Sequence, residues 1–487
     1  MTVKSLLAFM LLSLACSREV LAQGRPIDWP LFGGDAQRTG WEKVDSRITR
    51  ENVKDFQLVL KQKLDNKGSG PRSLSAPVVI GLLISYRGFK ELAFVAGSSG
   101  NVWALDADLE RVFWQRSFGG GAGPWPARSG RACSAAATPA LIPPPNFATR
   151  RASHTPDEKP KPAGPAYLNP AGFGAPRPVF ALANDGKLHL LNTSSGEDLA
   201  PAMQFIPPNS KASSLTFSDG FLYTTTTGKC GGAPDAVWAL DLSGAAPPVK
   251  FAPPAGGLPE LGGVAIGTDG TVYTRTGDGS VLALSAKDLK LTQSYNAPEA
   301  AARKRNPDSP APAVFTYKEH DLIVSASDDA RLVLLDSQSL GTPLFQTEPL
   351  TPSGKIWGGL SSWRDADGTR WIYAPVWGPA STGSIVALKL EEREGKPVLT
   401  PAWVSGEMSS PEPPVITGGM VFALSAGTKS SHATLYAFDA ATGKEMYSTK
   451  DQIPVPASLS GVSLANGRVY FTTVDNTLWA FGVYLER

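Results

Sequence analysis

Short apolar runs, separated by turns rich in glycine, aspartate or asparagine, recur along the whole chain. One six-residue phrase stands out: a small or polar residue, an apolar pair, Ala or Leu, Leu or Phe, then usually Asp or Asn. The phrase occurs eight times, as NVWALD (Asn101), KLHLLN (Lys187), AVWALD (Ala236), SVLALS (Ser280), RLVLLD (Arg331), SIVALK (Ser384), TLYAFD (Thr434) and TLWAFG (Thr477). The successive starts are 86, 49, 44, 51, 53, 50 and 43 residues apart. Six of these seven spacings are typical of one β-blade per repeat.

Each repeat has the same internal order. An apolar run such as APVVIGLLIS precedes a second run such as ELAFVAG, and a tight turn then leads into the phrase and a closing strand such as RVFWQRSF. This order predicts a four-stranded antiparallel meander. The phrase is continuously apolar, as expected for a strand that neighbouring sheets cover on both faces. Because no amphipathic helical pattern lies between repeats, we predict an all-β fold, an eight-bladed β-propeller.

The two ends of the repeat array predict how the ring closes. After the last phrase the chain ends at Arg487, one strand short of a blade. The run FQLVLKQKL (56–64) precedes the first repeat and belongs to none. We predict that it supplies the missing outer strand; the alternative is an unpaired edge strand.

One spacing is anomalous because of an insertion rich in proline. It runs from Pro143 to Pro178 and includes IPPPNF and PDEKPKPAGP. We interpret it as a long surface loop, with a docking arm or lid as the alternative. Residues 23–487 are then expected to form a single propeller domain that carries this insertion.

The N-terminus has the features of an export signal. A short basic end is followed by the apolar run SLLAFMLLSLA, and VLAQ places suitable residues for cleavage after Ala22. The signal would comprise residues 1–22, with a lipid anchor at Cys16 as the alternative. No later stretch has the roughly 18 consecutive apolar residues of a membrane span. We therefore expect an exported, periplasmic or extracellular protein without a transmembrane segment, and a monomer.

Charge and cysteine content narrow the classes of partner. The net charge is +2, charged residues make up 18% of the chain, and no Lys/Arg run occurs, so we expect no nucleic-acid partner. If Cys16 is removed with the signal, Cys133 and Cys230 remain. A pair of cysteines in an exported chain favours a disulfide, and two separate thiols are the alternative.

The sequence that follows the phrase resembles a known motif. ALDADLERVFW, AFDAATGKEMY and LLNTSSGEDLA are similar to the tryptophan-docking motif of the pyrroloquinoline-quinone (PQQ) repeat, Ala-x-Asp-x-x-x-Gly-x-x-x-Trp. In that family the motif locks each blade to the next. The resemblance therefore implies structural, blade-docking roles for Trp103, Asp106, Trp114, Asp241, Asp336, Asp439, Gly443 and Tyr447.

The segment DWPLFGGDAQRTGWE (28–42) also resembles the start of quinoprotein alcohol dehydrogenases. The wider family includes catalytic dehydrogenases and non-catalytic members, among them the propeller lipoprotein of the outer-membrane β-barrel assembly machinery. The catalytic members have a disulfide between adjacent cysteines and a calcium ion held by Glu, Asn and Asp. This chain has no Cys-Cys pair and no Cys-x-x-Cys-His haem motif, and no stretch matches the calcium ligands.

One set of residues departs from the repeats. GGGAGPWPARSGRAC, GKIWGGLSSW and APVWGPAST concentrate Trp, Gly and Arg before or between strands. Loops at such positions can reach the central channel, so we predict an aromatic and basic ligand pocket there. Its residues would be Trp125, Arg128, Arg131, Trp357 and Trp377. The alternative is that the tryptophans pack between blades and the arginines are solvated.

No other catalytic motif is present in the sequence. The four histidines have no second ligand at metal-binding spacing, and no nucleophile elbow, phosphate loop or dinucleotide fingerprint occurs. We therefore expect a non-catalytic binding or scaffold protein of the cell envelope that holds a protein or glycan and needs no cofactor. The alternatives are a dehydrogenase that uses PQQ and calcium with divergent ligand residues, and a hydrolase or lyase on the same scaffold.

Overall fold

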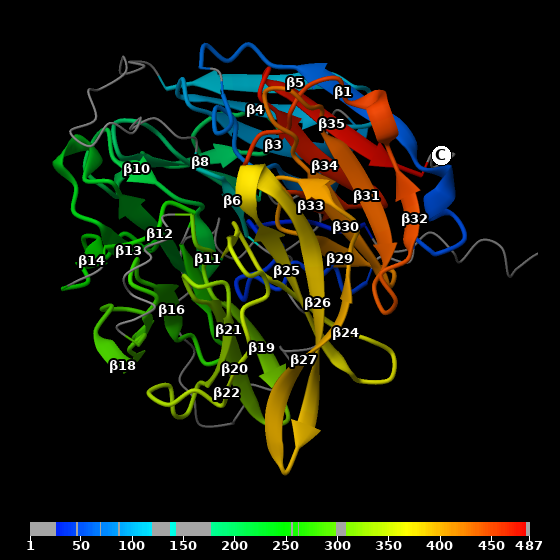
Figure 1. The fold of residues 1–487 in the computed structure, drawn as a ribbon. Helices are drawn as coiled ribbons and strands as arrows, with labels where there is room; N and C mark the ends of the chain where they lie inside the picture. Colours follow the sequence, from blue (N-terminus) through cyan, green and yellow to red (C-terminus); the bar gives the residue numbers. More distant parts are fainter. Residues whose placement is uncertain are drawn as a thin grey trace, which may run out of the picture.

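The structure is a computed structural model that describes residues 26–483, except 45–46, 69, 86–87, 119–136, 143–176, 255–256, 262 and 299–307. Within this part of the chain the strands form eight sheets, which follow one another around a ring in sequence order (Figure 1). The described residues contain no α-helix, only the 3₁₀ turns η1 (Val53–Asp55), η4 (Cys230–Gly232), η5 (Pro379–Ser381) and η6 (Lys450–Gln452). The predicted all-β, eight-bladed propeller is confirmed.

Each sheet is one blade, and its strands run from the channel outward in chain order, except that the outermost strand of blade 8 comes from the start of the chain. Blade 1 contains β2 (Val78–Ser85), β3 (Gly88–Gly97), β4 (Asn101–Asp106) and β5 (Arg111–Ser117). Blade 2 contains β6 (Ala140–Leu141), β7 (Pro178–Leu182), β8 (Lys187–Asn192) and β9 (Met203–Gln204). Blade 3 contains β10 (Lys211–Ala212) and β11 (Thr216–Ser218), which share the inner position, then β12 (Phe221–Thr227), β13 (Ala236–Asp241) and β14 (Val249–Phe251). Blade 4 contains β15 (Val264–Ile266), β16 (Val272–Arg275), β17 (Val281–Leu284) and β18 (Leu291–Tyr295).

The second half of the ring repeats this plan. Blade 5 contains β19 (Ala313–Tyr317), β20 (His320–Ala326), β21 (Leu332–Asp336) and β22 (Phe345–Gln346). Blade 6 contains β23 (Lys355–Ile356) and β24 (Ser361–Arg364) at the inner position, then β25 (Arg370–Trp377), β26 (Thr382–Arg393), β27 (Lys396–Val404) and β28 (Met408–Ser409). Blade 7 contains β29 (Val415–Thr417), β30 (Met420–Ser425), β31 (Thr434–Asp439) and β32 (Glu445–Ser448). Blade 8 contains β33 (Ser463–Ala465), β34 (Arg468–Thr473), β35 (Thr477–Gly482) and β1 (Gln57–Lys63).

The repeated phrase forms the third strand of every blade. In blade 1 it is β4, all of whose residues are buried, and it pairs antiparallel with β3 on one side and β5 on the other. This burial agrees with the continuously apolar sequence, because adjacent blades cover both faces of the strand.

The ring closes as the sequence predicts. β1 pairs antiparallel with β35 along its length, so the run before the first repeat is the outer strand of the last blade (Figure 1). The inner strands of neighbouring blades contact one another from β6 through to β33, and β33 contacts β2. The outer edge of β35 is therefore paired rather than exposed.

Tryptophans join successive blades at two places. The Trp114 indole donates a hydrogen bond to Thr193 O of blade 2 (2.9 Å), and its ring lies against Gly196, where an added Cβ would approach within 2.8 Å. The Trp403 indole of blade 6 donates to Ala440 O of blade 7 (2.9 Å) and lies against Gly443 in the same way. Gly196 and Gly443 both have positive φ angles, so two constraints favour glycine at these joints.

The other residues assigned to blade docking lie at turns or in the core. The Asp106, Asp241, Asp336 and Asp439 carboxylates each accept a backbone N–H two residues on, in the turn after the third strand. Asp106 also forms a buried ion pair with Lys90 (2.8 Å). Trp103 is fully buried in blade 1, and the Tyr447 ring packs on Phe56.

A buried polar network crosses the closure between blades 8 and 1. Glu91 of β3 has no exposed surface; it accepts hydrogen bonds from Tyr470 and from Asn466 Nδ2 (3.0 Å) and pairs with Arg468 (3.2 Å). Arg468 also reaches Asp108 (3.2 Å). The first and last repeats are thus held together by charge and hydrogen bonding as well as by the β1–β35 pairing.

Residues 27–42, the plug segment, pass through the inside of the ring and touch all eight blades in turn. Ile27 N donates to Asn466 of blade 8, Trp29 and Val79 of blade 1 exchange two hydrogen bonds, and Pro30 O accepts from Leu141 of blade 2. Further contacts follow with blades 3 to 7, at Ser214, Ile266, Val314, Ser362 and Ile416. Backbone groups on the channel side of the inner strands, which would otherwise be unpaired edge groups, are satisfied in this way.

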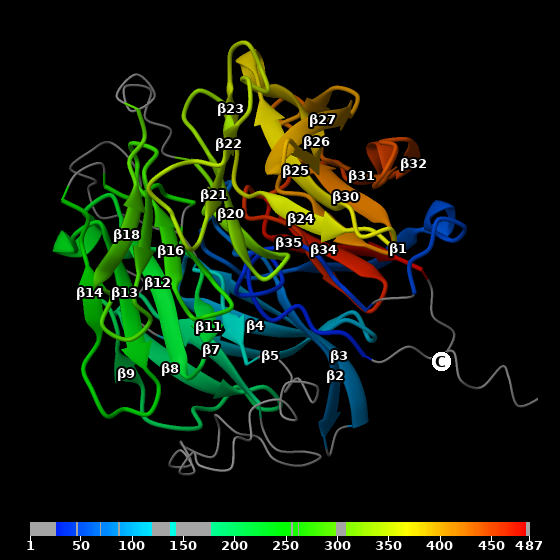
Figure 2. The same cartoon turned by 90° about the horizontal axis from the view of Figure 1, so that it is seen from below.

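The plug segment enters and leaves the channel at the same end. Asn466 and Gly418, which contact Ile27 and Ile48, lie in turns between first and second strands. Arg50 forms an ion pair with Asp439 (2.6 Å) in a turn between third and fourth strands. Because successive strands are antiparallel, these turns are at the end of the ring opposite the loops that join one blade to the next. Figure 2 shows the same fold turned by 90° about the horizontal axis. The plug segment therefore fills the channel from one end only.

Candidate functional site

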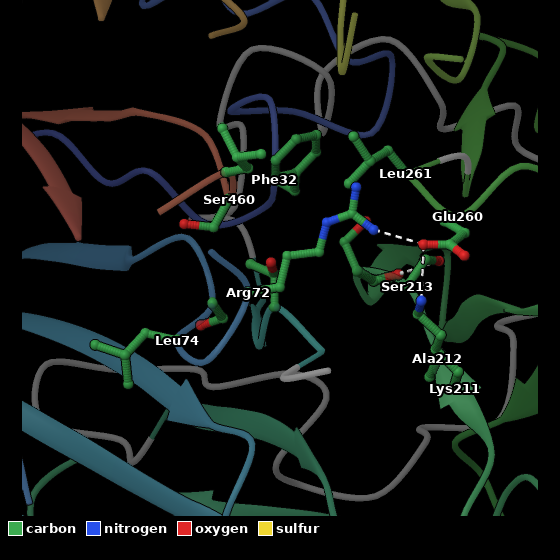
Figure 3. Close-up of a pocket in the computed structure, with 13 residues that line it drawn as sticks. Phe32, Arg72, Leu74, Lys211, Ala212, Ser213, Glu260, Leu261 and Ser460 are labelled. Carbon is green, nitrogen blue, oxygen red and sulfur yellow. Dashed lines mark hydrogen bonds and ion pairs between the residues drawn. The ribbon is translucent and has the colours of Figure 1, made fainter. Parts of the chain in front are cut away.

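The loops that lead into the inner strands converge at the other end of the channel, the channel mouth. They surround an open cavity of about 60 Å³ whose inner wall includes Phe32 of the plug segment (Figure 3). The cavity is lined by Phe32, Arg72, Leu74, Ser75, Thr138, Lys211, Ala212, Ser213, Ser214, Glu260, Leu261, Leu459 and Ser460. These residues come from the plug segment and from blades 1, 2, 3, 4 and 8, so only a closed ring assembles the cavity.

An ion-pair network spans the mouth. Arg72 contacts Glu260 (2.6 Å) with one guanidinium nitrogen and Asp308 (3.0 Å) with the other. Lys211 reaches the same oxygen of Glu260 (2.7 Å), as Figure 3 shows, and Lys355 pairs with the second oxygen of Asp308 (2.9 Å). Within the part of the chain that the structure describes, each of these carboxylates contacts two cations, so these five side chains together carry one more positive than negative charge.

Two tryptophans stack beside this network. β23 pairs with the end of β25, which places Lys355 opposite Trp377. Trp357 follows two residues after Lys355, and its ring lies over the Trp377 ring. The two rings are 4.1 Å apart and 16° from parallel. The Lys355 ammonium lies 4.9 Å from the centre of the Trp357 ring, in a cation–π contact. Trp357 is only 3% exposed, whereas Trp377 is half-buried.

A buried carboxyl group, Glu412, hydrogen-bonds to one of the stacked tryptophans. It is 1% exposed and accepts a hydrogen bond from the Trp357 indole (3.1 Å). Burial raises the pKa of Glu412 to about 8, against the opposing effects of the Trp357 hydrogen bond, the Arg72 charge and the Gly461 backbone N–H. Near neutral pH this carboxyl group holds its proton more strongly than an exposed glutamate does.

We expect Glu412→Gln to remove a pH dependence of stability. The pKa of Glu412 is higher in the folded protein than in the unfolded chain, so between these two values the folded protein binds more protons. The free energy of unfolding therefore falls as the pH rises from about 4.5 to 8. The slope is at most about 1.4 kcal/mol per pH unit. The amide cannot ionise, so the variant should be more stable than the parent at pH 8 and similar at pH 5. Urea unfolding across this range measures the difference. Glu407→Gln, an exposed change five residues earlier, is the control, and equal slopes for all three proteins would contradict the assignment.

The structure brings together two of the five residues predicted to form an aromatic and basic pocket. Trp357 and Trp377 stack at the channel mouth, and Lys355 and Arg72 lie near the Trp357 ring. Trp125, Arg128 and Arg131 lie outside the described residues. The sequence interpretation missed Arg72, Lys211, Glu260, Asp308, Lys355 and Glu412.

Other predictions also fall partly outside the described residues. The residues outside the described part include Cys133, the predicted signal in residues 1–22 and nearly all of the 143–178 insertion. Cys230 lies buried in the turn η4, between β12 and β13. The Cys133–Cys230 disulfide therefore stays a prediction. No helix within the described residues has the length and hydropathy needed to cross a bilayer.

Comparison with known proteins agrees with the architecture. A family model described as outer membrane protein assembly factor BamB matches residues 380–483. No curated protein matches the sequence. The quinohemoprotein alcohol dehydrogenase from Comamonas testosteroni is similar with a TM-score of 0.58 at 15% identity, over 94% of this chain and 81% of that one. The quinohemoprotein alcohol dehydrogenase ADHIIG from Pseudomonas putida HK5 gives a TM-score of 0.57 at 12% identity, with the same coverage.

BamB from Moraxella catarrhalis is similar with a TM-score of 0.49 at 14% identity, over 88% of this chain and all of that one. At such identities the likeness to solved structures concerns the fold. The likeness shows that the chain has the eight-bladed propeller fold, and the family model agrees over residues 380–483 with the resemblance stated from the sequence. Architecture alone does not assign chemistry, which has to be argued from the site.

Proposed function

We propose that this protein is a non-catalytic binding or scaffold protein of the cell envelope, and that the channel mouth is where it holds a partner. The observation that carries the proposal is the pairing of Glu260 and Asp308 with Arg72, Lys211 and Lys355. These cations neutralise the carboxylates of the mouth and leave a net positive, partly aromatic surface. Such a surface suits an acidic or polar segment of another macromolecule.

The residues at the mouth do not fit PQQ and calcium. A calcium ion needs several converging oxygen ligands without competing cations, and the described residues contain no group of three or more His, Cys, Asp or Glu that could hold a metal. The quinone ring could not stack on Trp357, because Trp377 covers the Trp357 ring and only 3% of Trp357 is exposed. The proposal therefore includes no quinone and no oxidation step.

Two further observations support a binding role. Tryptophan and arginine, which concentrate binding energy at protein interfaces, both line or flank the cavity. The family model for the outer membrane protein assembly factor BamB matches residues 380–483, which supports an envelope scaffold. Export, with cleavage after Ala22, and a single domain over residues 23–487 belong to the same proposal.

Site-specific photo-crosslinking in cells tests where the partner binds. A crosslinker at the exposed Ser353, beside Trp377, should give a discrete adduct with an envelope protein, whereas one at Lys290, in a turn at the plug end, should not. Lys355→Ala, which removes a mouth cation, should lower the yield of the Ser353 adduct several-fold. The Lys290 crosslinker serves as the matched control, since the Lys290 side chain is 80% exposed.

The dehydrogenase alternative gives opposite results in a second experiment. Purified protein mixed with PQQ and calcium should show neither a stoichiometric quinone absorbance nor dye-linked alcohol oxidation. A clear gain of both would overturn the scaffold proposal. Equal adducts from positions 353 and 290 would also count against it, because the mouth would then have no special role.

A further inference from the structure

The exposed large apolar side chains of this propeller gather at one end of the ring. Within the part of the chain that the structure describes there are eight: Val44, Leu58, Ile84, Phe89, Leu109, Val112, Leu291 and Val404. Seven lie at the plug end, where the plug segment enters the channel and where turns join third to fourth strands, whereas Val404, at the end of β27, lies at the mouth end. Because single exposed apolar side chains are ordinarily scattered, this uneven distribution indicates a surface that meets an apolar environment.

Blade 1 carries four of these seven side chains, on two neighbouring turns. β3 pairs with β2 from its first residue but with β4 only from Leu92 onward, so the tip of the β2–β3 hairpin projects beyond the rest of the blade (Figure 2). Ile84 and Phe89 are opposite each other at this tip and are 37% and 67% exposed. Leu109 and Val112 lie in and after the turn between β4 and β5. The two turns together form the most apolar part of the plug end.

The other three side chains extend this surface unequally. Leu58 lies near the start of β1, the outer strand of blade 8. Val44 lies where the chain leaves the channel, between a contact of Glu42 with blade 7 and a contact of Arg47 with blade 8. Leu291 lies apart from them, at the start of β18 in blade 4. Six of the seven side chains therefore follow an arc over blades 7, 8 and 1.

The N-terminal part of the chain enters the fold within the same arc. Ile27 N bonds to Asn466 of blade 8, and Ile27 O lies so close to Gly81 of blade 1 that an added Cβ would approach within 2.2 Å. Residues 1–25, which hold the apolar run SLLAFMLLSLA and Cys16, precede this point. Pro26 is ten residues after Cys16, a stretch of chain that spans at most roughly 35 Å. Any attachment to a membrane through these residues would therefore hold the plug end, and not the mouth, next to the bilayer.

Charged side chains of both signs stand between the apolar ones. In the β4–β5 turn an exposed glutamate and an exposed arginine separate Leu109 from Val112, and Arg50 and Glu51 are exposed at the same end. The core of a protein interface is depleted of such charges. A bilayer interface takes up aliphatic and aromatic side chains while neighbouring charged groups stay among the lipid headgroups. A bilayer is therefore the partner that suits these turns.

We propose that the plug end is a membrane-binding surface, and that Ile84, Phe89 and Leu109 enter the interface of a phospholipid bilayer. The mouth then points away from the membrane, toward the partner proposed above. The two surfaces lie at opposite ends of the ring, so this proposal does not depend on the function proposed for the mouth.

Flotation of the purified mature protein, residues 23–487, with phospholipid vesicles tests this surface without any N-terminal anchor. Vesicles of phosphatidylethanolamine and phosphatidylglycerol should carry the parent protein upward in a density gradient. The double variant Ile84→Ser with Phe89→Ser should lower the partition coefficient about tenfold, because it removes the apolar area that is buried on insertion. Val404→Ser, a matched change of a side chain that is 60% exposed at the mouth end, should bind like the parent.

The alternatives give different results. No vesicle binding by the parent, or equal loss of binding in Val404→Ser and the double variant, would overturn the proposal. A concentration-dependent dimer in sedimentation, lost in the double variant while vesicles bind neither protein, would assign the surface to a second copy of this chain. Binding only to vesicles that contain envelope proteins would assign it to a protein partner. The crosslinker at Ser353 tests the mouth separately, so failure of one proposal leaves the other intact.

Discussion

Trp29→Ala is expected to lower the free energy of unfolding by about 3–5 kcal/mol, as for other large aromatic truncations in a core. Trp29 is 1% exposed and sits where the plug segment pairs with Val79. Gly34 lies so close to its ring that an added Cβ would approach within 2.9 Å. A cavity at this point cannot easily collapse, because the plug backbone is fixed by hydrogen bonds to neighbouring blades.

Urea unfolding at constant pH measures this loss. Trp29→Phe keeps most of the ring volume and should lose much less stability. Phe89→Ala removes an aromatic ring that is 67% exposed and should change stability by less than about 0.5 kcal/mol. If Trp29→Ala were as stable as Phe89→Ala, the plug segment would contribute little to the fold.

Arg468→Met is expected to cost a similar amount, about 3–5 kcal/mol, for an electrostatic reason. The substitution keeps an unbranched apolar stem but leaves Glu91, which has no exposed surface, without its cation. Burial already raises the pKa of Glu91, and the charge of Arg468 opposes that rise. Without Arg468 the folded-state pKa of Glu91 rises further above the unfolded value, so the variant loses stability as pH rises above about 4.3 and recovers below it.

Comparison of urea midpoints at pH 4 and pH 8 checks this sign. The double variant Glu91→Gln with Arg468→Met should recover most of the loss at pH 8, because it removes the buried charge along with its partner. Arg116→Met breaks an exposed pair between blades 1 and 2 and should cost at most about 1 kcal/mol. If Arg468→Met lost the same free energy of unfolding at both pH values, packing rather than charge would hold the first and last blades together.

The blades could be predicted from the sequence because their signal is local. The phrase around Trp103 recurs at a nearly constant spacing, and each copy is one strand with its own turn. The role of the run 56–64 followed from counting strands: the last blade needed one more. Both inferences need only periodicity and the rule that sheet edges are covered.

The mouth could be predicted only in part. Trp357 and Trp377 were recognisable since they lie in one blade and depart from the repeat. Arg72, Glu260, Asp308 and Glu412 come from different blades, and their pairing depends on the closed ring. One signal was available: each lies within six residues of the start of an inner strand, where a loop must face the channel.

The plug segment was missed for a different physical reason. DWPLFGGDAQRTGWE has neither the strict alternation of a strand nor the period of a helix, because its residues bond to different blades at irregular intervals, with a gap between Pro30 and Ala36. The sequence showed only its resemblance to the start of quinoprotein dehydrogenases. Its path depends on all eight inner strands at once.

Because the plug segment contacts all eight blades, it can reach its native position only late in folding. Ile27 bonds to Asn466, 439 residues later, and β1 pairs with the last strand, so the first residues of the propeller to be synthesised are among the last to find their partners. Contacts between such distant residues slow folding, and the unpaired strands stay exposed to aggregation until the eighth blade arrives. We expect refolding from urea to be slow and to end in a single late phase in which Trp29 becomes buried. A holding chaperone would be most useful during the interval when seven blades exist and the ring is still open.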